Sequence, residues 1–237
     1  MFTKEYLDRI QKELNTAVLC DMLDDLGYRN QAMDGSLYPL EEGYKLAGVA
    51  RTILAYDVFE QPTEAYATEI EAVDALCEGD VAVFVNPSCS NGVWGELMTN
   101  AAIARGARGA IIDGAVRDIT QIKELSGQFK LFTKGRNPLD SKGRCLVAAY
   151  DCPVTCAGVM VKPGDLIFGD IDGIVVVPSE VAETAVERAF EKIAGENLVR
   201  DALRSGMTLK DAFAKYHMLS KKRRRRLRVA NARPFMI

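Results

Sequence analysis

The sequence predicts a single mixed α/β domain with helices at both ends of the chain. Residues 81–125 run in the order strand, loop, helix, strand, loop, helix. Residues 128–180 read as a series of strands separated by turns, and the segments before residue 27 and after residue 179 carry helical patterns. Alternating strands and helices are typical of parallel β–α units around one core.

Two helices are expected before the first strand. Residues 4–14 place apolar side chains on one helical face, at Tyr6, Leu7, Ile10 and Leu14. Asn15 or Thr16 is a good N-cap for a second helix, and Gly27 is a good stop for it. This segment therefore predicts two successive helices at the start of the domain.

The middle of the chain predicts the β–α units themselves. Residues 46–58 and 81–86 are expected as strands, with a helix over 63–78 that ends at Gly79. The next elements are expected as a loop over 86–93, a helix over 94–105, a strand over 110–113, a turn over 114–118 and a helix over 118–125.

The last third predicts a hairpin and then helices. Asp172-Gly173 between two apolar runs is a hairpin signal, and Asp170 and Asp172 are expected to shape that turn. Helices are expected over 179–204 and over 208–216. We predict one domain over residues 1–220 and a basic tail over 221–237. The tail either solubilises the protein or bridges subunits, or it binds nucleic acid or a partner.

The composition limits which binding partners and which acid–base groups can be expected. The net charge is only −3, which gives no reason to expect nucleic-acid binding, and no apolar run approaches the length of a membrane helix. The six cysteines form no Cys-x-x-Cys pair and are expected to be reduced thiols in a cytoplasmic protein. The single histidine, His217, leaves acid–base chemistry to carboxylates, lysine, water or a metal ion.

Two segments offer chemistry at predicted strand-to-helix junctions. Gly95 to Met98 opens a helix, where unpaired amides and the helix dipole bind anions, although a plain capped helix start fits equally. Arg117 and Asp118 follow a strand, where an arginine fork suits a carboxylate and an aspartate suits a hard cation. The alternative is a surface ion pair in which Asp118 caps the next helix.

The stretch from Trp94 to Asp118, WGELMTNAAIARGARGAIIDGAVRD, resembles the RraA-like family. The stretches LAGVARTIL at 46–54 and PVTCAGVMVKPGDLIFGDIDGIVVVP at 153–178 resemble it too, as does the late helix that carries Glu196. The family contains class II 4-hydroxy-4-methyl-2-oxoglutarate aldolases, which also decarboxylate oxaloacetate, and regulators of ribonuclease activity. The resemblance implies a compact β/β/α domain of the swivelling type, assembled as homotrimers or homohexamers.

The resemblance also implies roles for individual residues. The segment that binds pyruvate falls on Gly95, Glu96, Leu97 and Met98, where Glu96 stands for the family's aspartate and Met98 for its leucine. The substrate arginine falls on Arg117 and the metal-binding aspartate on Asp118. Glu196 is the candidate for a glutamate that a neighbouring subunit contributes.

The implied activity is retro-aldol cleavage of a 4-hydroxy-2-oxo acid to pyruvate, with Mg²⁺ or Mn²⁺ as cofactor and oxaloacetate decarboxylation at the same site. Arg117, Asp118 and Glu96 are the catalytic candidates. The ribonuclease regulators resemble the same pattern but lack the aspartate after the arginine, so Asp118 favours the enzyme. The alternatives are a regulator that acts by protein or RNA binding, and a related lyase or hydratase.

Overall fold

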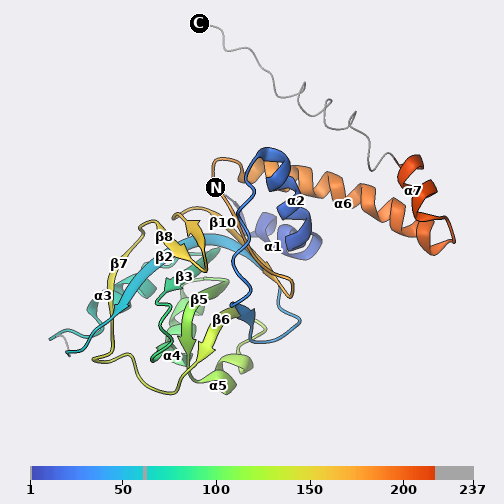
Figure 1. Ribbon diagram of the computed structural model, residues 1–237. Helices are drawn as coiled ribbons and strands as arrows, with labels where there is room; N and C mark the ends of the chain where they lie inside the picture. Colours follow the sequence, from blue (N-terminus) through green and yellow to red (C-terminus); the bar gives the residue numbers. More distant parts are fainter. Residues whose placement is uncertain (1, 61–62, 217–237) are drawn as a thin grey trace, which may run out of the picture. The chain divides into compact units, whose positions relative to one another are not determined.

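The computed structural model describes residues 2–60 and 63–216 (Figure 1). Contacts divide the chain into two compact units, Met1–Ala189 and Phe190–Ile237. The first unit holds the whole sheet and the helices that precede it; the second holds the C-terminal part of α6 (Ala182–Arg204) and α7 (Leu209–Lys215). The predicted basic tail over 221–237, its boundary at residue 220 and His217 lie outside the described residues.

The two N-terminal helices form as predicted. Helix α1 spans Lys4–Glu13 and buries Leu7 and Ile10. Helix α2 spans Thr16–Leu26; the Asn15 side chain accepts a hydrogen bond from the amide of Val18, and Gly27 ends the helix with a φ of 96°. Both signals act within one helical turn, which is why the sequence specifies them well.

The main sheet has nine strands in the described part of the chain, and seven of them form the path β1-β6-β5-β3-β2-β10-β11. The path consists of β1 (Tyr38–Pro39), β6 (Lys130–Arg136), β5 (Gly109–Val116), β3 (Asp80–Val85), β2 (Leu46–Asp57), β10 (Leu166–Asp170) and β11 (Gly173–Val177). Strand β4 (Gly92–Trp94) pairs with β5, and β7 (Cys145–Tyr150) pairs with β2. The short strands β8 (Val154–Cys156) and β9 (Val159–Val161) form a separate hairpin.

The centre of the sheet is parallel, as the β–α alternation predicts. Strand β2 pairs with β3, β3 with β5 and β5 with β6, all in parallel. Every residue of β3 and of β5 is buried, the pattern expected of parallel strands that are covered on both faces. The α/β class with helices at both ends of the chain is confirmed.

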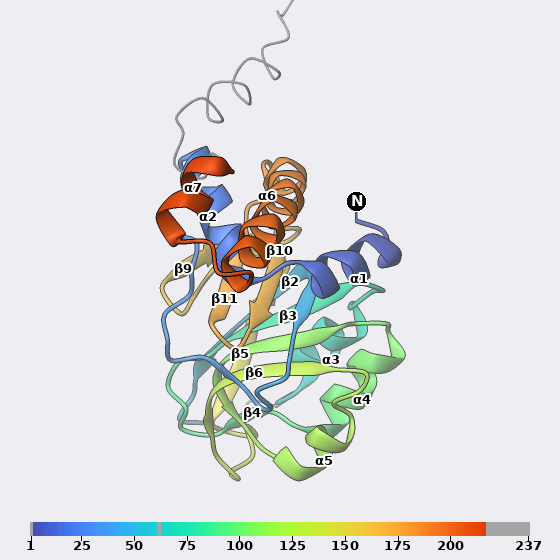
Figure 2. The ribbon, with the colours of Figure 1, turned by 90° about the vertical axis from the view of Figure 1, so that its right-hand side faces the viewer.

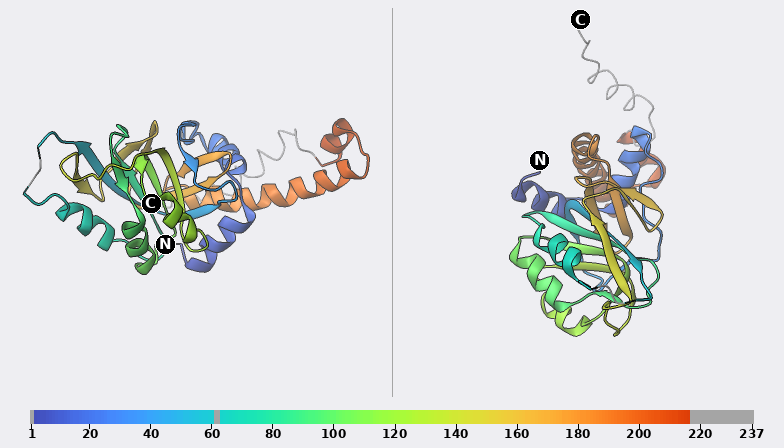
Figure 3. Two further views of the ribbon diagram at one scale, coloured as in Figure 1. Left: turned by 90° about the horizontal axis from the view of Figure 1, so that it is seen from below. Right: turned by 90° about the vertical axis from the view of Figure 1, so that its left-hand side faces the viewer.

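Three helices cover one face of these parallel strands. They are α3 (Ala67–Asp74), α4 (Glu96–Ala104) and α5 (Ile119–Glu124), and Figures 2 and 3 show them in a row on the same side of β3, β5 and β6. This placement follows from right-handed crossovers, which put consecutive connecting helices on one face. It also brings the start of each helix to the edge where the parallel strands end.

Several predicted boundaries were wrong. The helix expected over 63–78 is only α3, eight residues long. Residues 114–116, expected as a turn, extend β5, and residues 92–94, expected as loop and helix, form β4. Strand β4 is three residues long and is held by pairing with a distant segment, so no local pattern marks it.

Other expectations are confirmed. The Asp172-Gly173 turn joins β10 to β11 as an antiparallel hairpin, and the amide of Asp172 donates to Asp170 Oδ1 at 3.0 Å. All six cysteines are free thiols. Among the helices that the structure describes, none is long and apolar enough to cross a membrane.

Candidate active site

The two segments singled out in the sequence lie next to each other in space. Arg117 and Asp118 directly follow β5, and Gly95 directly follows β4, the parallel neighbour of β5. The amide of Arg117 donates to the carbonyl of Trp94 at 3.0 Å and continues the pairing past the strand ends. The strand ends therefore form the wall of one site, at the edge of the sheet where open α/β folds bind ligands.

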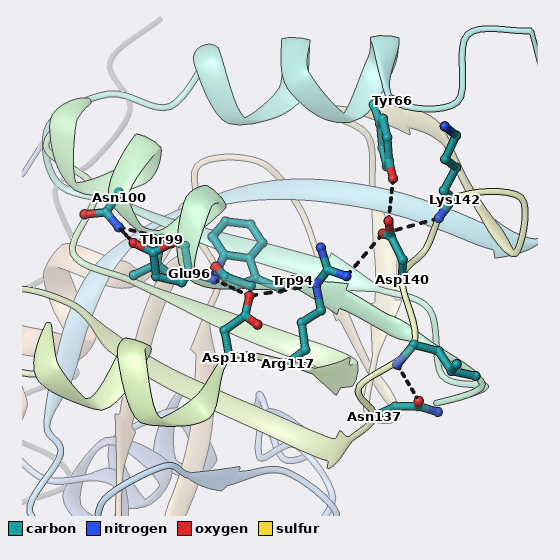
Figure 4. A network of polar contacts seen from close by, with 12 residues as sticks. Tyr66, Trp94, Glu96, Thr99, Asn100, Arg117, Asp118, Asn137, Asp140 and Lys142 are labelled. Atoms are coloured by element: carbon teal, nitrogen blue, oxygen red, sulfur yellow. Dashed lines mark hydrogen bonds and ion pairs between the residues drawn. The ribbon is translucent and has the colours of Figure 1, made fainter.

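Asp118 connects the two segments. Its Oδ2 accepts a hydrogen bond from the amide of Glu96 at 3.2 Å, at the first residue of α4 (Figure 4). A Cβ atom on Gly95 would lie 2.6 Å from this same oxygen, closer than real contacts allow. Any side chain at position 95 would therefore compete for space with the Asp118 carboxylate in its observed position.

The simpler interpretation of Asp118 is met in part: the surface pair with Arg117 is present at 3.8 Å, but the side-chain cap on α5 is not. Asp118 occupies the N-cap position of α5, but its side chain makes no capping hydrogen bond there. Its φ of 57° and ψ of 36° are left-handed, a conformation that costs about 1–3 kcal/mol for a residue other than glycine. The chain thus turns this carboxylate away from α5 and toward the start of α4.

Arg117 lies between two carboxylates. Its Nε is 3.8 Å from Asp118 Oδ2, and its Nη1 is 3.5 Å from Asp140 Oδ1. The arginine side chain is 36% exposed, and both separations are longer than a direct hydrogen bond. The guanidinium therefore keeps donors that can bind an incoming carboxylate from two sides.

The sequence did not point to Asp140 or to its partner Tyr66. The Tyr66 hydroxyl donates to Asp140 Oδ2 at 2.9 Å, and burial together with this carboxylate raises the pKa of Tyr66 to about 12. Burial opposes the ionisation of Asp140, but the hydrogen bond from Tyr66 and the charge of Arg117 outweigh it and lower the pKa of Asp140. These residues are 74 positions apart in the chain, so no motif joins them.

The pyruvate-binding segment predicted from the resemblance occupies the first turn of α4. The amides of Leu97 and Met98 belong to the part of the helix that has no intrahelical acceptor. The Leu97 side chain is 78% exposed beside them, whereas Met98 packs against the core. An anion bound here would meet two amides, the positive end of the helix dipole and one apolar side chain.

Glu96 is the first residue of α4, and Glu196 lies on α6. The Glu96 carboxylate is half-buried and accepts a hydrogen bond from Asn100, one turn further along α4. Glu196 lies on α6 in the second unit, where it pairs with Lys192 at 3.7 Å. Their catalytic roles stay predictions.

A second polar group lies at the ends of β2 and β3, and the sequence did not reveal it. Asp57 Oδ1 accepts from Asn86 Nδ2 at 3.0 Å and from the Ser88 hydroxyl at 2.8 Å. The Ser90 hydroxyl donates to the other oxygen of Asp57 at 3.3 Å. Polar side chains therefore continue along the same edge of the sheet beyond Arg117.

Asp118 is an accessible carboxylate of the candidate site to which a divalent cation can bind. No three acidic, cysteine or histidine side chains within the described residues are grouped closely enough to hold a metal ion by themselves. The Asp118 side chain is 41% exposed, so water and substrate have access to it. Mg²⁺ commonly binds in this manner, through one or two carboxylates with the remaining ligands from water and substrate.

Comparison with known proteins identifies the family that this chain matches. The model of the RraA-like family, described as Aldolase/RraA, matches residues 16–176. Protein DlpA of Legionella pneumophila is 31% identical over 205 residues, which cover 85% of this chain and 32% of DlpA. The chain thus spans about a third of the length of that relative. A Halalkalibacterium halodurans protein, provisionally named a 4-hydroxy-4-methyl-2-oxoglutarate aldolase, is 30% identical over 189 residues, covering 78% of this chain and 82% of the relative.

Solved structures agree with this assignment. A protein from Pseudomonas syringae pv. tomato superposes with a TM-score of 0.77 at 33% identity, covering 91% of this chain and 95% of that chain. RraAS2 of Streptomyces coelicolor, described as an unusual member of the RNase ES inhibitor RraA protein family, superposes with a TM-score of 0.73 at 28% identity, covering 84% and 97%.

Proposed function

This chain belongs to the RraA-like family, and from that premise we propose that it cleaves a carbon–carbon bond of a small 2-oxo acid and releases pyruvate. The substrate is 4-hydroxy-4-methyl-2-oxoglutarate or a related 4-hydroxy-2-oxo acid, and oxaloacetate is decarboxylated at the same site. The observation that carries the proposal is the junction of two strand ends, where Asp118 Oδ2 lies 3.2 Å from the amide that opens α4 and Arg117 lies beside it.

The binding step uses the chain's own donors. The amides of Leu97 and Met98 hold the substrate carboxylate at the N-terminus of α4. Arg117 binds the oxygen atoms on which negative charge builds up as the bond breaks. The two amides are fixed by the fold before the substrate arrives, and Arg117 lies between Asp118 and Asp140, within 4 Å of both carboxylates.

Asp118 would hold the Mg²⁺ or Mn²⁺ ion that the family resemblance implies. When bound, the ion supplies a Lewis acid that polarises the 2-oxo group and stabilises the enolate. The Asp118 side chain is 41% exposed, so it is accessible to a hydrated ion, and this supports the role.

The two activities differ in their need for a base. Retro-aldol cleavage requires removal of the proton on the C4 hydroxyl, and a water molecule positioned by Glu96 and by Glu196 of a neighbouring subunit performs this. Decarboxylation of oxaloacetate forms the same enolate by loss of CO₂ and needs no such base. The assembly that would supply the second glutamate is the predicted homotrimer or homohexamer.

The alternative function, regulation of a ribonuclease, rests on the names of two structural relatives, which are described as inhibitors of a ribonuclease or of RNA processing. Pyruvate release tests the enzyme directly. We expect release from both substrates with added Mg²⁺ or Mn²⁺, loss of release with EDTA and recovery when the ion is restored. Because divalent ions decarboxylate oxaloacetate slowly by themselves, the ion without protein is the control. Equal enzymatic rates with and without EDTA would contradict a metal-assisted reaction.

Glu96→Gln should separate the two activities. The uncharged glutamine amide cannot help a bound water molecule to accept the proton of the C4 hydroxyl. Aldol cleavage should therefore fall by about 10²–10⁴, the usual contribution of a general base, and decarboxylation should fall less. Both rates are measured as pyruvate release at saturating Mg²⁺. The matched control is Glu124→Gln on α5, where the glutamate is exposed. Equal losses in both activities would remove Glu96 from the proton transfer.

A further inference from the structure

Tyr66, Asp140 and Arg117 form a chain of contacts that ends at the proposed metal ligand. The Tyr66 hydroxyl holds Asp140 Oδ2 at 2.9 Å, and Asp140 Oδ1 faces Arg117 Nη1 at 3.5 Å (Figure 4). The other side of the same guanidinium faces Asp118 Oδ2 at 3.8 Å. The Arg117 guanidinium is thus shared between the carboxylates of Asp140 and Asp118 at nearly equal separations.

We propose that Asp140, held by Tyr66, is a positioning residue that keeps the Arg117 guanidinium from closing on Asp118, so that Asp118 stays available to a divalent cation. This inference rests on the proposed function, because it takes Asp118 as the metal ligand. Tyr66 and Asp140 touch neither the substrate nor the ion in this account; they act through Arg117.

The argument follows from competition for one carboxylate. An arginine side chain is long and flexible, whereas the Asp118 carboxylate is fixed by its left-handed backbone and by the amide of Glu96. If Asp140 lost its charge, Asp118 would become the acidic partner nearest to the guanidinium. A close two-pronged pair between Arg117 and Asp118 would then occupy the oxygen atoms that a cation needs.

The anchoring of Asp140 explains why it is suited to this role. Its carboxylate accepts from the Tyr66 hydroxyl, and its Oδ1 also faces the amide of Lys142 at 3.5 Å. Its main chain bridges to Gly92, the first residue of β4, in the same sheet that positions Arg117. Asp140 is therefore held by Tyr66, the residue before α3, and by its own loop, independently of the arginine that it attracts.

The test measures Mn²⁺ binding to the full-length protein by electron paramagnetic resonance, without substrate and without turnover. Asp140→Asn should weaken Mn²⁺ binding about 3–10-fold. This is the range expected when a partly exposed Arg117–Asp118 ion pair competes with Mn²⁺ for the Asp118 carboxylate. Tyr66→Phe keeps the charge of Asp140 but releases its anchor, so it should weaken binding by a smaller factor. Asp74→Asn is the matched control, because Asp74 pairs with surface Arg105 on the neighbouring helix at 2.9 Å and should leave Mn²⁺ binding unchanged.

A double-mutant cycle separates positioning from simple loss of negative charge. If Asp140 acts through Arg117, the Asp140→Asn effect should vanish in an Arg117→Ala background. The same loss in both backgrounds, or no loss in either, would overturn the inference while leaving the proposed function intact. Equal Mn²⁺ binding by wild type and Asp118→Asn would overturn both, since Asp118 would then not be the metal ligand.

Discussion

Asp118 combines a strained backbone with the position of the proposed metal ligand. Its left-handed backbone, with a φ of 57°, is tolerated by aspartate and asparagine better than by most other residues. The conformation aims the carboxylate at the first amide of α4, where it makes a hydrogen bond at 3.2 Å. Strain of this kind is retained where the surrounding structure fixes it, and here β5 and α5 fix it from both sides.

Glu69 predicts a pH-dependent stability. This half-buried residue of α3 has its pKa raised from 4.5 to about 7, first by burial and then by the charge of Asp140. The folded state therefore binds this proton more tightly than the unfolded chain does, so the contribution to folding stability is lost as pH rises from about 4.5 to about 7. Glu69→Gln removes that loss and should be more stable than wild type at about pH 8, by on the order of 1–2 kcal/mol after allowance for solvent screening.

Urea unfolding near pH 4.5 and near pH 8 measures this difference. Glu71→Gln is the matched control on the same helix, because Glu71 is exposed. The difference in unfolding free energy between wild type and Glu69→Gln should grow with pH, and the difference between wild type and Glu71→Gln should not. A constant offset for both variants would show that Glu69 ionises normally in the folded protein.

At the scale of elements, the pairing of β4 with β5 builds the site. The pairing aligns Trp94 with Val116, so the residues that follow each strand meet directly. Trp94 is buried below this junction; its indole donates to Thr99 at 2.9 Å, and its ring stacks on Phe129. The first turn of α4 is thereby fixed to the core beneath the proposed anion-binding amides.

Gly95→Ala should damage the site while sparing the fold. The backbone at Gly95 is extended, with a φ of −146° that any residue adopts, but the added methyl group would lie 2.6 Å from Asp118 Oδ2. The displaced carboxylate should lower pyruvate release by about 10²-fold, the scale of a misplacement near 1 Å. Steady-state rates and urea unfolding are measured together on the same preparation.

Gly127→Ala is the control for this substitution. No atom lies within 4 Å of the position that its Cβ would take, so both rate and stability should stay close to wild type. A Gly95→Ala protein with normal turnover would mean that the Asp118 carboxylate need not occupy its observed position. A protein that loses stability together with activity would instead place Gly95 among the packing residues.

Individual helices and strands show what the sequence could and could not predict. Helix α2 was predicted with its caps because Asn15 and Gly27 act within one turn of the helix ends. The parallel pairing of β3 with β5 followed from the alternation of strands and helices over residues 81–125. Strand β4 could not be predicted, because its three residues are held only by pairing with β5 and by a bridge from Gly92 to Asp140.

For the whole molecule, the resemblance predicted the family and the class of fold, and the comparisons confirm both. Within the candidate site, the positions of Arg117 and Asp118 were predicted because they follow a strand in one short motif. Tyr66 and Asp140 were missed because only the tertiary fold brings α3 and the loop before β7 to Arg117. The assembly and the basic tail over 221–237 stay predictions from the sequence.

The central claim is that Arg117 and Asp118 perform a metal-assisted cleavage of a 2-oxo acid. The most direct measurement is pyruvate release as a function of Mg²⁺ concentration for wild type, Asp118→Asn and Arg117→Lys, with Arg105→Lys as the surface control. We predict that Asp118→Asn requires much more Mg²⁺ for any activity, and that Arg117→Lys loses about 10²–10³ in turnover at saturating Mg²⁺, the effect of removing one charge-stabilising donor. Turnover within about threefold of wild type in both variants, with the same Mg²⁺ dependence, would contradict the claim.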